Sequence, residues 1–314
     1  MPGGVALPGG KNLAASTWRQ ELGGKNLVEG QEGMNELTGF SFMLVADDYA
    51  MSPAVSGGIL EALAAGRLSG TGAMTNRPFW PQGARELLAA DAGSKAGLHL
   101  NLTCGEPLTK MPGLAASGKL PRLRTLQTGG WRRNLPRGEL AAEIRAQLDA
   151  FVQAIGAPPV FIDGHQHVQM LPQIREILFE ELSRRSWQGK VWLRDGADQP
   201  SAMVRRRIEL IKAAGVSVLG CGFGRAARAA GFATNAGFSG FSAFDPDRDY
   251  AADFARYLVA PGSRHLVMCH PGHIDDELRA VDPNTQSREN ELVFLLSRRF
   301  QDVLSRSHAK LATI

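Results

Sequence analysis

The segment FIDGHQHVQMLP, residues 161–172, concentrates side chains of the types that bind metal ions. Asp163, His165 and His167 stand at every second position after an apolar start. Residues two apart in a strand point to the same face, so this spacing predicts that all three side chains share one site. Imidazole nitrogens and carboxylate oxygens are common ligands of divalent cations. For this motif alone, the alternative is a polar strand edge that happens to hold two histidines.

Other acidic and imidazole groups also follow predicted strands. The chain has seven histidines. Besides the first segment, the groups at predicted strand ends are Asp47 with Asp48 after SFMLVA, His99 in GLHLNLT, and His270 with His273 in CHPGH. The carboxyl ends of the strands of a parallel barrel meet at one mouth. Asp48, His99 and His165 therefore predict a metal site of two histidines and one carboxylate, with positions left for water and substrate.

The two adjacent aspartates need a special backbone to act together. Neighbouring side chains of a regular strand point to opposite faces. A strand that ends at Asp47 and Asp48 would let both face the mouth, one as a ligand and the other as a base. Asp48 could instead cap the next helix, but Ser52, followed by Pro53, is the better N-cap candidate. We therefore interpret both aspartates as functional.

Apolar runs that alternate with helical patterns predict the architecture. Strands are expected at 41–46, 70–76, 96–103, 160–168, 190–195, 216–220 and 265–270. Helices are expected at 54–66 and at 138–156, where one face carries Leu140, Ile144, Leu148, Phe151, Val152 and Ile155. This alternation is typical of a mostly parallel sheet, either a barrel or a doubly wound sheet, and we favour the barrel. We expect a single domain over residues 39–314, an irregular, TIM-barrel-like (β/α) barrel of about seven parallel strands.

The composition is that of an ordinary globular protein, with 44% hydrophobic and 21% charged residues among 314. We find no apolar run near the roughly 18 residues of a membrane span and no secretory signal pattern, so we expect a cytoplasmic protein. Residues 1–38 are rich in glycine, contain GGKNL twice and are interpreted as a poorly ordered extension. Cys104, Cys221 and Cys269 form no CxxC pair, which predicts buried thiols rather than disulfides or a thiolate zinc site.

The basic charge is local. The net charge is +4, yet residues 110–137 contain seven basic and no acidic residues, so the rest of the chain sums to −3. We interpret this segment as a solvated loop or a lid over a site. No aromatic interleaving and no basic recognition helix accompany it, so nucleic acid is not an expected partner.

Five separated motifs resemble those of the YdjC-like (ChbG/HpnK) carbohydrate deacetylases, in the order and at the approximate spacing of that family. They are LVADDYAMSPAVSGGI, GLHLNLTCGEPL, FIDGHQHVQMLP, WLRD and MCHPGH, and they extend from Phe40 to about Leu296. The resemblance implies an irregular (β/α) barrel, often dimeric, that removes acetyl from an N-acetylated sugar with a divalent cation. The sequence departs from the pattern at Ala50, where glycine is usual, and at Gln169, where a further histidine is common.

The resemblance also implies roles for single residues. Asp48, His99 and His165 would be the metal ligands, and Asp47 the catalytic base. Magnesium is the usual suggestion for the family, while zinc is the stronger Lewis acid at imidazoles. We predict that His270 protonates the leaving amine, with His167 as the second candidate. Asp163, His167 and Arg194 are expected to bind substrate or to orient the ligands.

Two other functions fit parts of the sequence. A non-haem Fe(II) oxygenase also uses two histidines and one carboxylate, but its usual scaffold is all-β. A sugar-binding or regulatory barrel without turnover is the other alternative, and loss of Asp47 or His99 would have indicated it, but both are present. Which N-acetyl sugar is used stays open among chitooligosaccharides, a glucosaminyl lipid headgroup and others.

Overall fold

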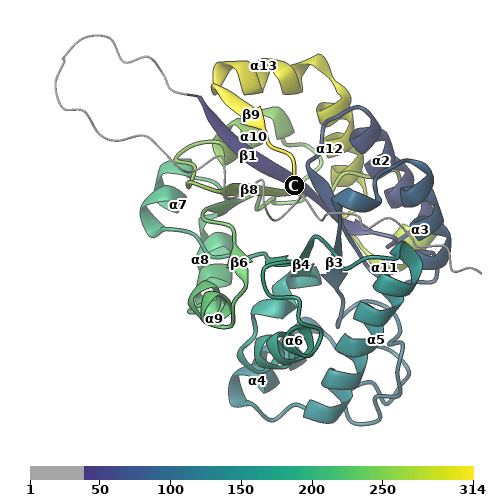
Figure 1. The fold of residues 1–314 in the computed structure, drawn as a ribbon. Helices are drawn as coiled ribbons and strands as arrows, with labels where there is room; N and C mark the ends of the chain where they lie inside the picture. Colours follow the sequence, from purple (N-terminus) through teal and green to yellow (C-terminus); the bar gives the residue numbers. More distant parts are fainter. Residues whose placement is uncertain (1–38) are drawn as a thin grey trace, which may run out of the picture. The chain divides into compact units, whose positions relative to one another are not determined.

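The computed structural model describes residues 39–314, in which strands and helices alternate (Figure 1). The expected N-terminal extension and its GGKNL pair lie outside the described residues. The strands are β1 (Phe40–Tyr49), β2 (Gly70–Ala73), β3 (Ala96–Leu100), β4 (Phe161–Gly164), β5 (Trp192–Leu193), β6 (Ala233–Thr234), β7 (Phe238–Ser239), β8 (His265–Cys269) and β9 (Ala309–Leu311).

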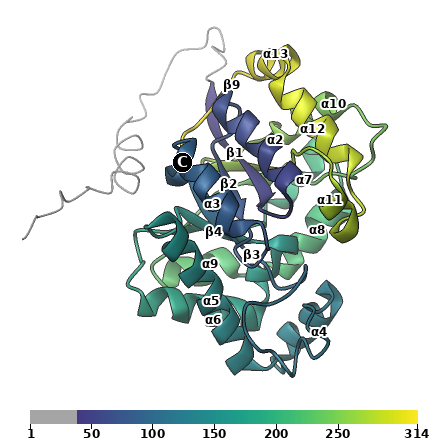
Figure 2. The same cartoon turned by 90° about the vertical axis from the view of Figure 1, so that its right-hand side faces the viewer.

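Helices connect the strands and cover the sheet (Figure 2). They are α2 (Pro53–Ala64), α3 (Trp80–Ala89), α4 (Leu123–Arg132), α5 (Arg137–Ile155), α6 (Pro172–Arg184), α7 (Pro200–Arg206), α8 (Leu210–Leu219), α9 (Phe223–Ala229), α10 (Tyr250–Tyr257), α11 (Asp276–Val281), α12 (Gln286–Leu296) and α13 (Arg298–Arg306). Two 3₁₀ helices, η1 (Gly93–Lys95) and η2 (His165–Met170), precede β3 and follow β4.

All strands of the sheet pair in parallel, which confirms the predicted irregular (β/α) barrel. The hydrogen-bonded order is β6-β5-β4-β3-β2-β1-β8-β7, and β9 pairs with the first three residues of β1. Strands β6 and β7 end this path, so within residues 39–314 the barrel is open between them. The sheet has nine strands rather than about seven, because β6, β7 and β9 are only two or three residues long and carry too little pattern to predict.

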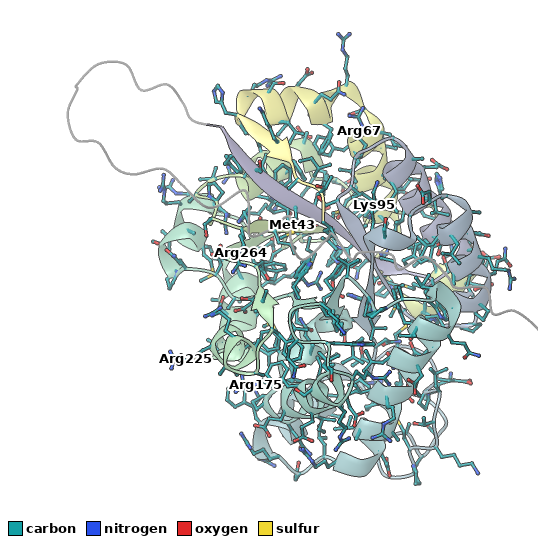
Figure 3. The ribbon with its side chains drawn as sticks, in the orientation of Figure 1. Met43, Arg67, Lys95, Arg175, Arg225 and Arg264 are labelled. Carbon is teal, nitrogen blue, oxygen red and sulfur yellow. The ribbon has the colours of Figure 1, made fainter. Side chains whose placement is uncertain are left out.

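The central strands are apolar on both faces because helices cover one face and the other lines the barrel. Leu44, Val45 and Ala46 of β1 are completely buried, and Met43 lies within the same strand (Figure 3). Continuous apolar runs are typical of such doubly covered parallel strands. On α5, the predicted face is confirmed: Leu140, Ile144, Leu148 and Phe151 are fully buried, while Val152 and Ile155 are partly buried. Each fully buried side chain of this size contributes about 1.5–3 kcal/mol of transfer free energy.

The start of α2 is capped as predicted. Ser52 is the N-cap, its hydroxyl accepts from the Val55 amide at 3.3 Å, and Pro53 is the first helical residue. Asp48 is therefore not the cap of this helix, which leaves its carboxylate for another purpose.

Three local predictions are wrong. Residues 216–220 belong to α8 and its C-cap rather than to a strand, because a short apolar run does not distinguish a strand from an amphipathic helix. Strand β4 ends at Gly164, so His165 and His167 lie in η2 rather than in a strand. Cys104 and Cys269 are buried free thiols as expected, but Cys221, which follows the α8 C-cap, is exposed.

One stretch of the described chain is long and apolar enough to span a membrane by length and composition, Leu210–Ala229, with a mean hydropathy of 1.2. It consists of α8 and α9, which Gly222 separates with a φ of 77°. A third of the stretch is buried in the protein. A pattern of this kind is also found in the helices of globular proteins, so it is weak evidence for a span.

Candidate active site

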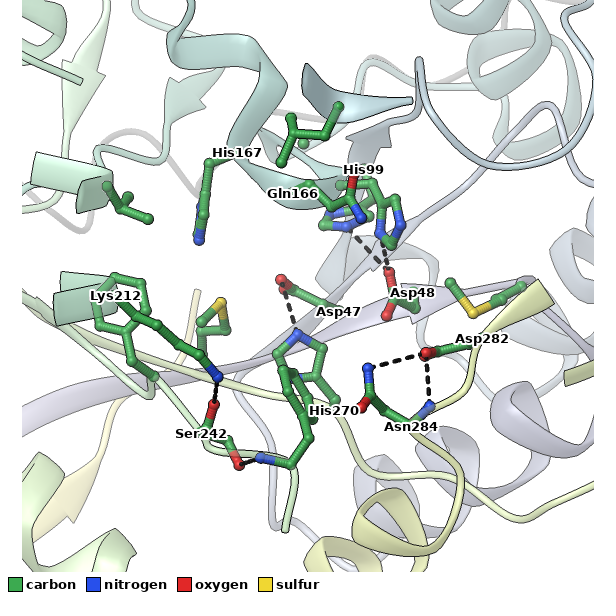
Figure 4. A pocket seen from close by; sticks show the side chains of 18 of the residues that line it. Asp47, Asp48, His99, Gln166, His167, Lys212, Ser242, His270, Asp282 and Asn284 are labelled. Carbon is green, nitrogen blue, oxygen red and sulfur yellow. Dashed lines mark hydrogen bonds and ion pairs between the residues drawn. The ribbon is translucent and has the colours of Figure 1, made fainter. Parts of the chain in front are cut away.

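A cavity of about 620 Å³ opens at the carboxyl ends of the strands (Figure 4). Its lining includes most of the predicted site residues, namely Asp47, Asp48, His99, His165, His167, Arg194 and His270. Asp163 lies directly behind His99. The structure therefore brings together side chains from β1, β3, β4 and η2 with the residues that directly follow β5 and β8, as expected for a parallel barrel.

A local irregularity of β1 turns both adjacent aspartates toward the cavity. The β1–β2 register shifts between Ala46 and Tyr49, so that three steps along β1 correspond to two along β2. Asp48 and Ala50 both have a φ of 69°, in the left-handed region. The left-handed conformation explains why glycine is usual at position 50, since a Cβ there costs about 1–2 kcal/mol. Backbone strain of this kind is typical of functional sites.

The carboxylate of Asp48 joins two imidazoles. Its Oδ1 lies 3.2 Å from Nε2 of His99 and 2.9 Å from Nδ1 of His165. Asp48 and His99 are buried, and the His165 side chain is only 17% exposed, toward the cavity. Three potential ligand atoms thus converge from β1, β3 and the residue that follows β4.

Asp163 orients His99 from behind. Nδ1 of His99 lies 2.7 Å from Oδ1 of Asp163, on the neighbouring strand β4. A carboxylate accepts only, so Nδ1 carries the proton and, in the neutral ring, Nε2 presents a lone pair. This arrangement of carboxylate, histidine and open nitrogen is typical of metal sites. Asp163 therefore contacts a candidate ligand, and its supporting role stays a prediction.

The turn after β4 separates the two histidines of the HxH motif. Gln166 and His167 have φ values of 54° and 60°, so the chain leaves strand geometry directly after Gly164. His165 points to Asp48, whereas His167 packs edge-on against Phe238 and Phe241. The prediction that Asp163, His165 and His167 alternate on one strand face is wrong for this reason, although all three still contribute to the same region.

Asp47 contacts a second set of groups. Its Oδ1 accepts from Nη1 of Arg194 at 2.6 Å, and its Oδ2 lies 3.9 Å from Nε2 of His270. The same guanidinium nitrogen lies 2.8 Å from Oδ2 of Asp163, so Arg194 connects the two carboxylates. Burial alone would raise the pKa of Asp47, but Arg194, His99 and His270 hold it below its usual value. Asp47 is therefore an ionised, buried carboxylate beside the cluster of Asp48, His99 and His165.

The histidines of the site differ in their pKa. For His99, burial alone would lower the pKa, but the Asp163 and Asp47 carboxylates raise it to about 10. For His270, burial lowers the pKa to about 4 despite Asp47, and for His167 burial together with Arg194 lowers it to about 3. At neutral pH, His270 and His167 are thus neutral imidazoles, whereas His99 is protonated and a cation at its Nε2 would displace that proton. Nδ1 of His270 and of His167 is buried and has no hydrogen-bond partner among the described residues.

Arg288 of α12 is a site residue that the sequence analysis missed. Its Nη2 lies 2.6 Å from Oδ2 of Asp48 and 2.6 Å from Oδ2 of Asp282. Burial alone would raise the pKa of Asp48, but Arg288 and His165 hold it well below its usual value. No local signal marks Arg288, because it follows no strand and lies in a helix with an ordinary polar pattern.

The remaining predicted residues lie at the edge of the site or outside it. His273 is an exposed residue that pairs with Glu61 at 2.9 Å and does not line the cavity. Gln169, at the position of the third histidine of an HxHxH run, is buried and donates to the Arg194 carbonyl at 3.2 Å. The basic segment 110–137 is only partly a loop, since it contains α4, whose Leu123 and Gln127 line the cavity.

The donor set fits a divalent cation. Asp48, His99 and His165 offer ligand atoms that all lie within 4.8 Å of one another. A second group, Asp47, His99 and Asp163, meets the same distance limit. The first group is the better candidate, because in the second Arg194 already pairs with both carboxylates and Asp163 binds His99 through Nδ1.

The fold and the site together define a parallel (β/α)-barrel protein with a carboxylate and imidazole cluster at the carboxyl ends of its strands. The family model of YdjC-like protein matches residues 41–306, which contain all of these residues. The chain belongs to the YdjC-like family, as the sequence motifs predict.

Individual relatives agree with this assignment. A chitooligosaccharide deacetylase of Escherichia fergusonii is 36% identical over 135 residues, which are 42% of this chain and 52% of the relative. One from Yersinia pestis is 38% identical over 130 residues, 41% of this chain and 50% of the relative. The chain thus spans about half the length of the curated relatives it matches.

A solved structure supports the fold. A protein from Enterococcus faecalis, named for a proposed cleavage of cellobiose phosphate, superposes with a TM-score of 0.64 over 88% of this chain and 97% of its own. The sequence identity is 19%, so this likeness concerns the barrel alone.

Proposed function

We propose that the protein is a metal-dependent hydrolase that removes the acetyl group from an N-acetylated amino sugar, releasing acetate and a free amine. The observation that carries this proposal is the position of the ionised carboxylate of Asp47 beside the Asp48, His99 and His165 cluster, within one cavity. The names of the relatives, chitooligosaccharide deacetylases, support the same reaction.

Asp48, His99 and His165 would hold the cation. A divalent cation bound there would polarise the acetamide carbonyl and lower the pKa of water. The donor set of one carboxylate and two imidazoles suits magnesium, manganese, iron, cobalt or zinc. We name magnesium first, as the family resemblance suggests, and zinc as the alternative.

Asp47 is the proposed general base. Its Oδ1 is held by Arg194, so the carboxylate has a fixed orientation and keeps its charge in a buried site. Its Oδ2 is free of that bond and takes the proton of the attacking water. The water oxygen then bonds to the acetyl carbon to form a tetrahedral oxyanion. The 2.6 Å bond to Arg194 keeps the base from turning away from the cavity.

His270 is the proposed proton donor to the leaving amine. It begins as a neutral imidazole, so it must first gain a proton, and its Nε2 lies 3.9 Å from Oδ2 of Asp47. The proton that Asp47 accepts can therefore pass through His270 to the amine nitrogen as the carbon–nitrogen bond breaks. The proton count balances, because water supplies the one proton that the amine needs.

Asp163, Arg194 and His167 have supporting parts in this proposal. Asp163 sets the His99 tautomer, and Arg194 orients Asp47. His167 is neutral, and its ring lines the cavity, where it would contact the bound sugar. Phe244 adds an apolar surface, because its ring lies 5.1 Å from that of His270 in the same cavity. A cavity of about 620 Å³ is within the range of small-molecule sites and supports a sugar of one or two rings.

The test is acetate release from diacetylchitobiose by metal-stripped full-length protein with magnesium or zinc added back. We expect cation-dependent release, and a loss of at least about 100-fold in kcat for Asp47→Asn with unchanged cation affinity. Asp276→Asn, at a fully exposed acid on α11, is the matched control and should behave as wild type. Release without a cation, or full activity of Asp47→Asn, would contradict the proposal.

The cytoplasmic location and the homodimer that the sequence analysis expects both stay predictions.

A further inference from the structure

Helices α7 and α8 expose an unusual number of large apolar side chains. Ile211 is 90% exposed, Val218 68%, Val204 61% and Leu210 42%. Figures 1 and 2 both place α7 and α8 side by side. We call these four residues, together with the exposed bases Arg205, Arg207 and Lys212, the α7–α8 surface. Contiguous exposed apolar side chains of this kind mark interaction sites.

The apolar residues of α8 form one stripe next to the cavity. Ile211, Ala214 and Val218 are exposed and spaced three and seven residues apart, so they share one helix face. A neighbouring face of the same helix, with Lys212, Val216 and Leu219, lines the cavity described above. Whatever covers the α8 stripe therefore lies beside the opening of the candidate active site.

The same region is strongly basic. Residues 200–231 contain six basic residues and one acidic residue. Arg206 is buried and pairs with Asp198, so the five other bases and Glu209 leave a net charge of +4 in this region. Arg205, Arg207 and Arg225 are exposed and form no ion pair with any residue in 39–314. Figure 3 shows Arg225 projecting outward from this part of the molecule. Basic residues around an apolar helix face complement an anionic, apolar partner.

Two possible occupants fit this surface poorly. In a two-fold dimer, the same surface meets itself, so its basic residues would face the basic residues of the other copy and repel them. Single-stranded nucleic acid binds to exposed aromatic side chains, whereas the exposed side chains here are aliphatic. An anionic lipid surface complements both the apolar and the basic side chains, because acyl chains accept aliphatic side chains and anionic headgroups attract arginine and lysine.

We propose that the α7–α8 surface docks the protein on an anionic lipid bilayer, with α8 lying in the interface and the cavity opening beside it. Helix α8 is too short to cross a bilayer, since Gly222 ends the apolar stretch with a left-handed turn before α9 begins. The helix therefore lies along the surface instead of spanning it. This docking does not depend on the deacetylase activity proposed above.

The test measures binding of the full chain to lipid vesicles by co-sedimentation. Vesicles of phosphatidylcholine alone are compared with vesicles that contain about a third phosphatidylglycerol. We expect binding to the anionic vesicles that weakens with salt, and at least about tenfold weaker binding for Ile211→Ser/Val218→Ser and for Arg205→Glu/Arg207→Glu. Asp47→Asn should bind like wild type, which separates docking from catalysis.

Matched controls come from α12 and α13. Val293→Ser removes a 64% exposed apolar side chain, and Arg298→Glu/Arg306→Glu makes the same change in net charge at two other exposed arginines. Both should keep wild-type binding, and all variants should keep the wild-type Tm. Equal binding to neutral and anionic vesicles, no binding to either, or equal losses in the controls would overturn the proposal. The proposal would also be overturned if light scattering showed a dimer that dissociates in Ile211→Ser/Val218→Ser while vesicle binding persists.

Discussion

At the scale of single residues, the site is a network of buried charges in which every carboxylate contacts an arginine or an imidazole. Asp47 pairs with Arg194, and Asp48 pairs with Arg288 and two histidines. A buried carboxylate without such partners would cost several kcal/mol, so the arginines allow two adjacent aspartates to stay ionised in one cavity. This arrangement leaves one aspartate for the cation and the other for proton transfer.

Asp163 gives a prediction that separates orientation from catalysis. Asp163→Asn should lower the affinity for zinc by about 10–100-fold, because the amide no longer requires the His99 tautomer that presents Nε2. Isothermal titration of metal-stripped protein measures this directly. The comparison is Asp47→Asn, which should bind zinc as wild type does. Equal zinc affinities for wild type and Asp163→Asn would show that the tautomer is set by another contact.

At the scale of elements, close packing of β2 against β3 and β4 holds the His99–Asp163 pair in place. A Cβ at Gly72 would lie 3.0 Å from Oδ1 of Asp163 and 3.2 Å from Cβ of His99. Gly72→Ala should therefore displace this pair and lower both zinc affinity and acetate release by about tenfold. Gly57→Ala, on α2 where the space is open, is the control and should leave both unchanged. Wild-type zinc binding by Gly72→Ala would mean that β2 moves to accommodate the methyl group.

The first residue of β8 predicts how stability depends on pH. Nε2 of His265 lies 3.0 Å from the Tyr257 carbonyl oxygen. Burial and, to a smaller extent, the positive charge of Arg206 lower the pKa of His265 to about 4, against an ordinary value of 6.5. Between these values the unfolded chain binds more protons than the folded one, so stability is retained above pH 6.5 and falls as the pH drops toward 4.

His265→Gln should remove this acid sensitivity. From pH 7 to pH 5, the wild type should lose about 2 kcal/mol more free energy of unfolding than the variant does. Urea unfolding at the two pH values gives both numbers, and the variant itself corrects for the other titrating groups. Parallel losses in the two proteins would show that His265 is protonated in the fold.

At the scale of the whole molecule, the apolar core described above lies within residues 39–314, and the family match begins at residue 41. We expect a chain that starts at Leu37 to keep the Tm of the full chain within about 2 °C, because it retains every core residue of the described range 39–314. Calorimetry of both chains provides the comparison, with zinc affinity as a second measurement. A large fall in Tm would show that the N-terminal residues contribute to the folded unit.

The sequence by itself determined the order of strands and helices at the site, and it identified seven of the cavity's polar residues. It did so because a parallel barrel places the residues after each strand at one mouth, so that local patterns are enough to find them. The same reasoning predicted Ser52 as the cap of α2 and the buried face of α5, since both follow from spacing along the chain.

Only the tertiary structure decided how these residues pair. Arg288 and Asp48 are 240 positions apart in the sequence. His165 begins a turn whose next two residues are left-handed, and no apolar pattern predicts this turn. Strands β6, β7 and β9 are likewise set by their neighbours, because two or three residues have little preference of their own. Spacing along the chain therefore specifies which side chains come to the cavity, while packing between distant elements specifies which atoms meet there.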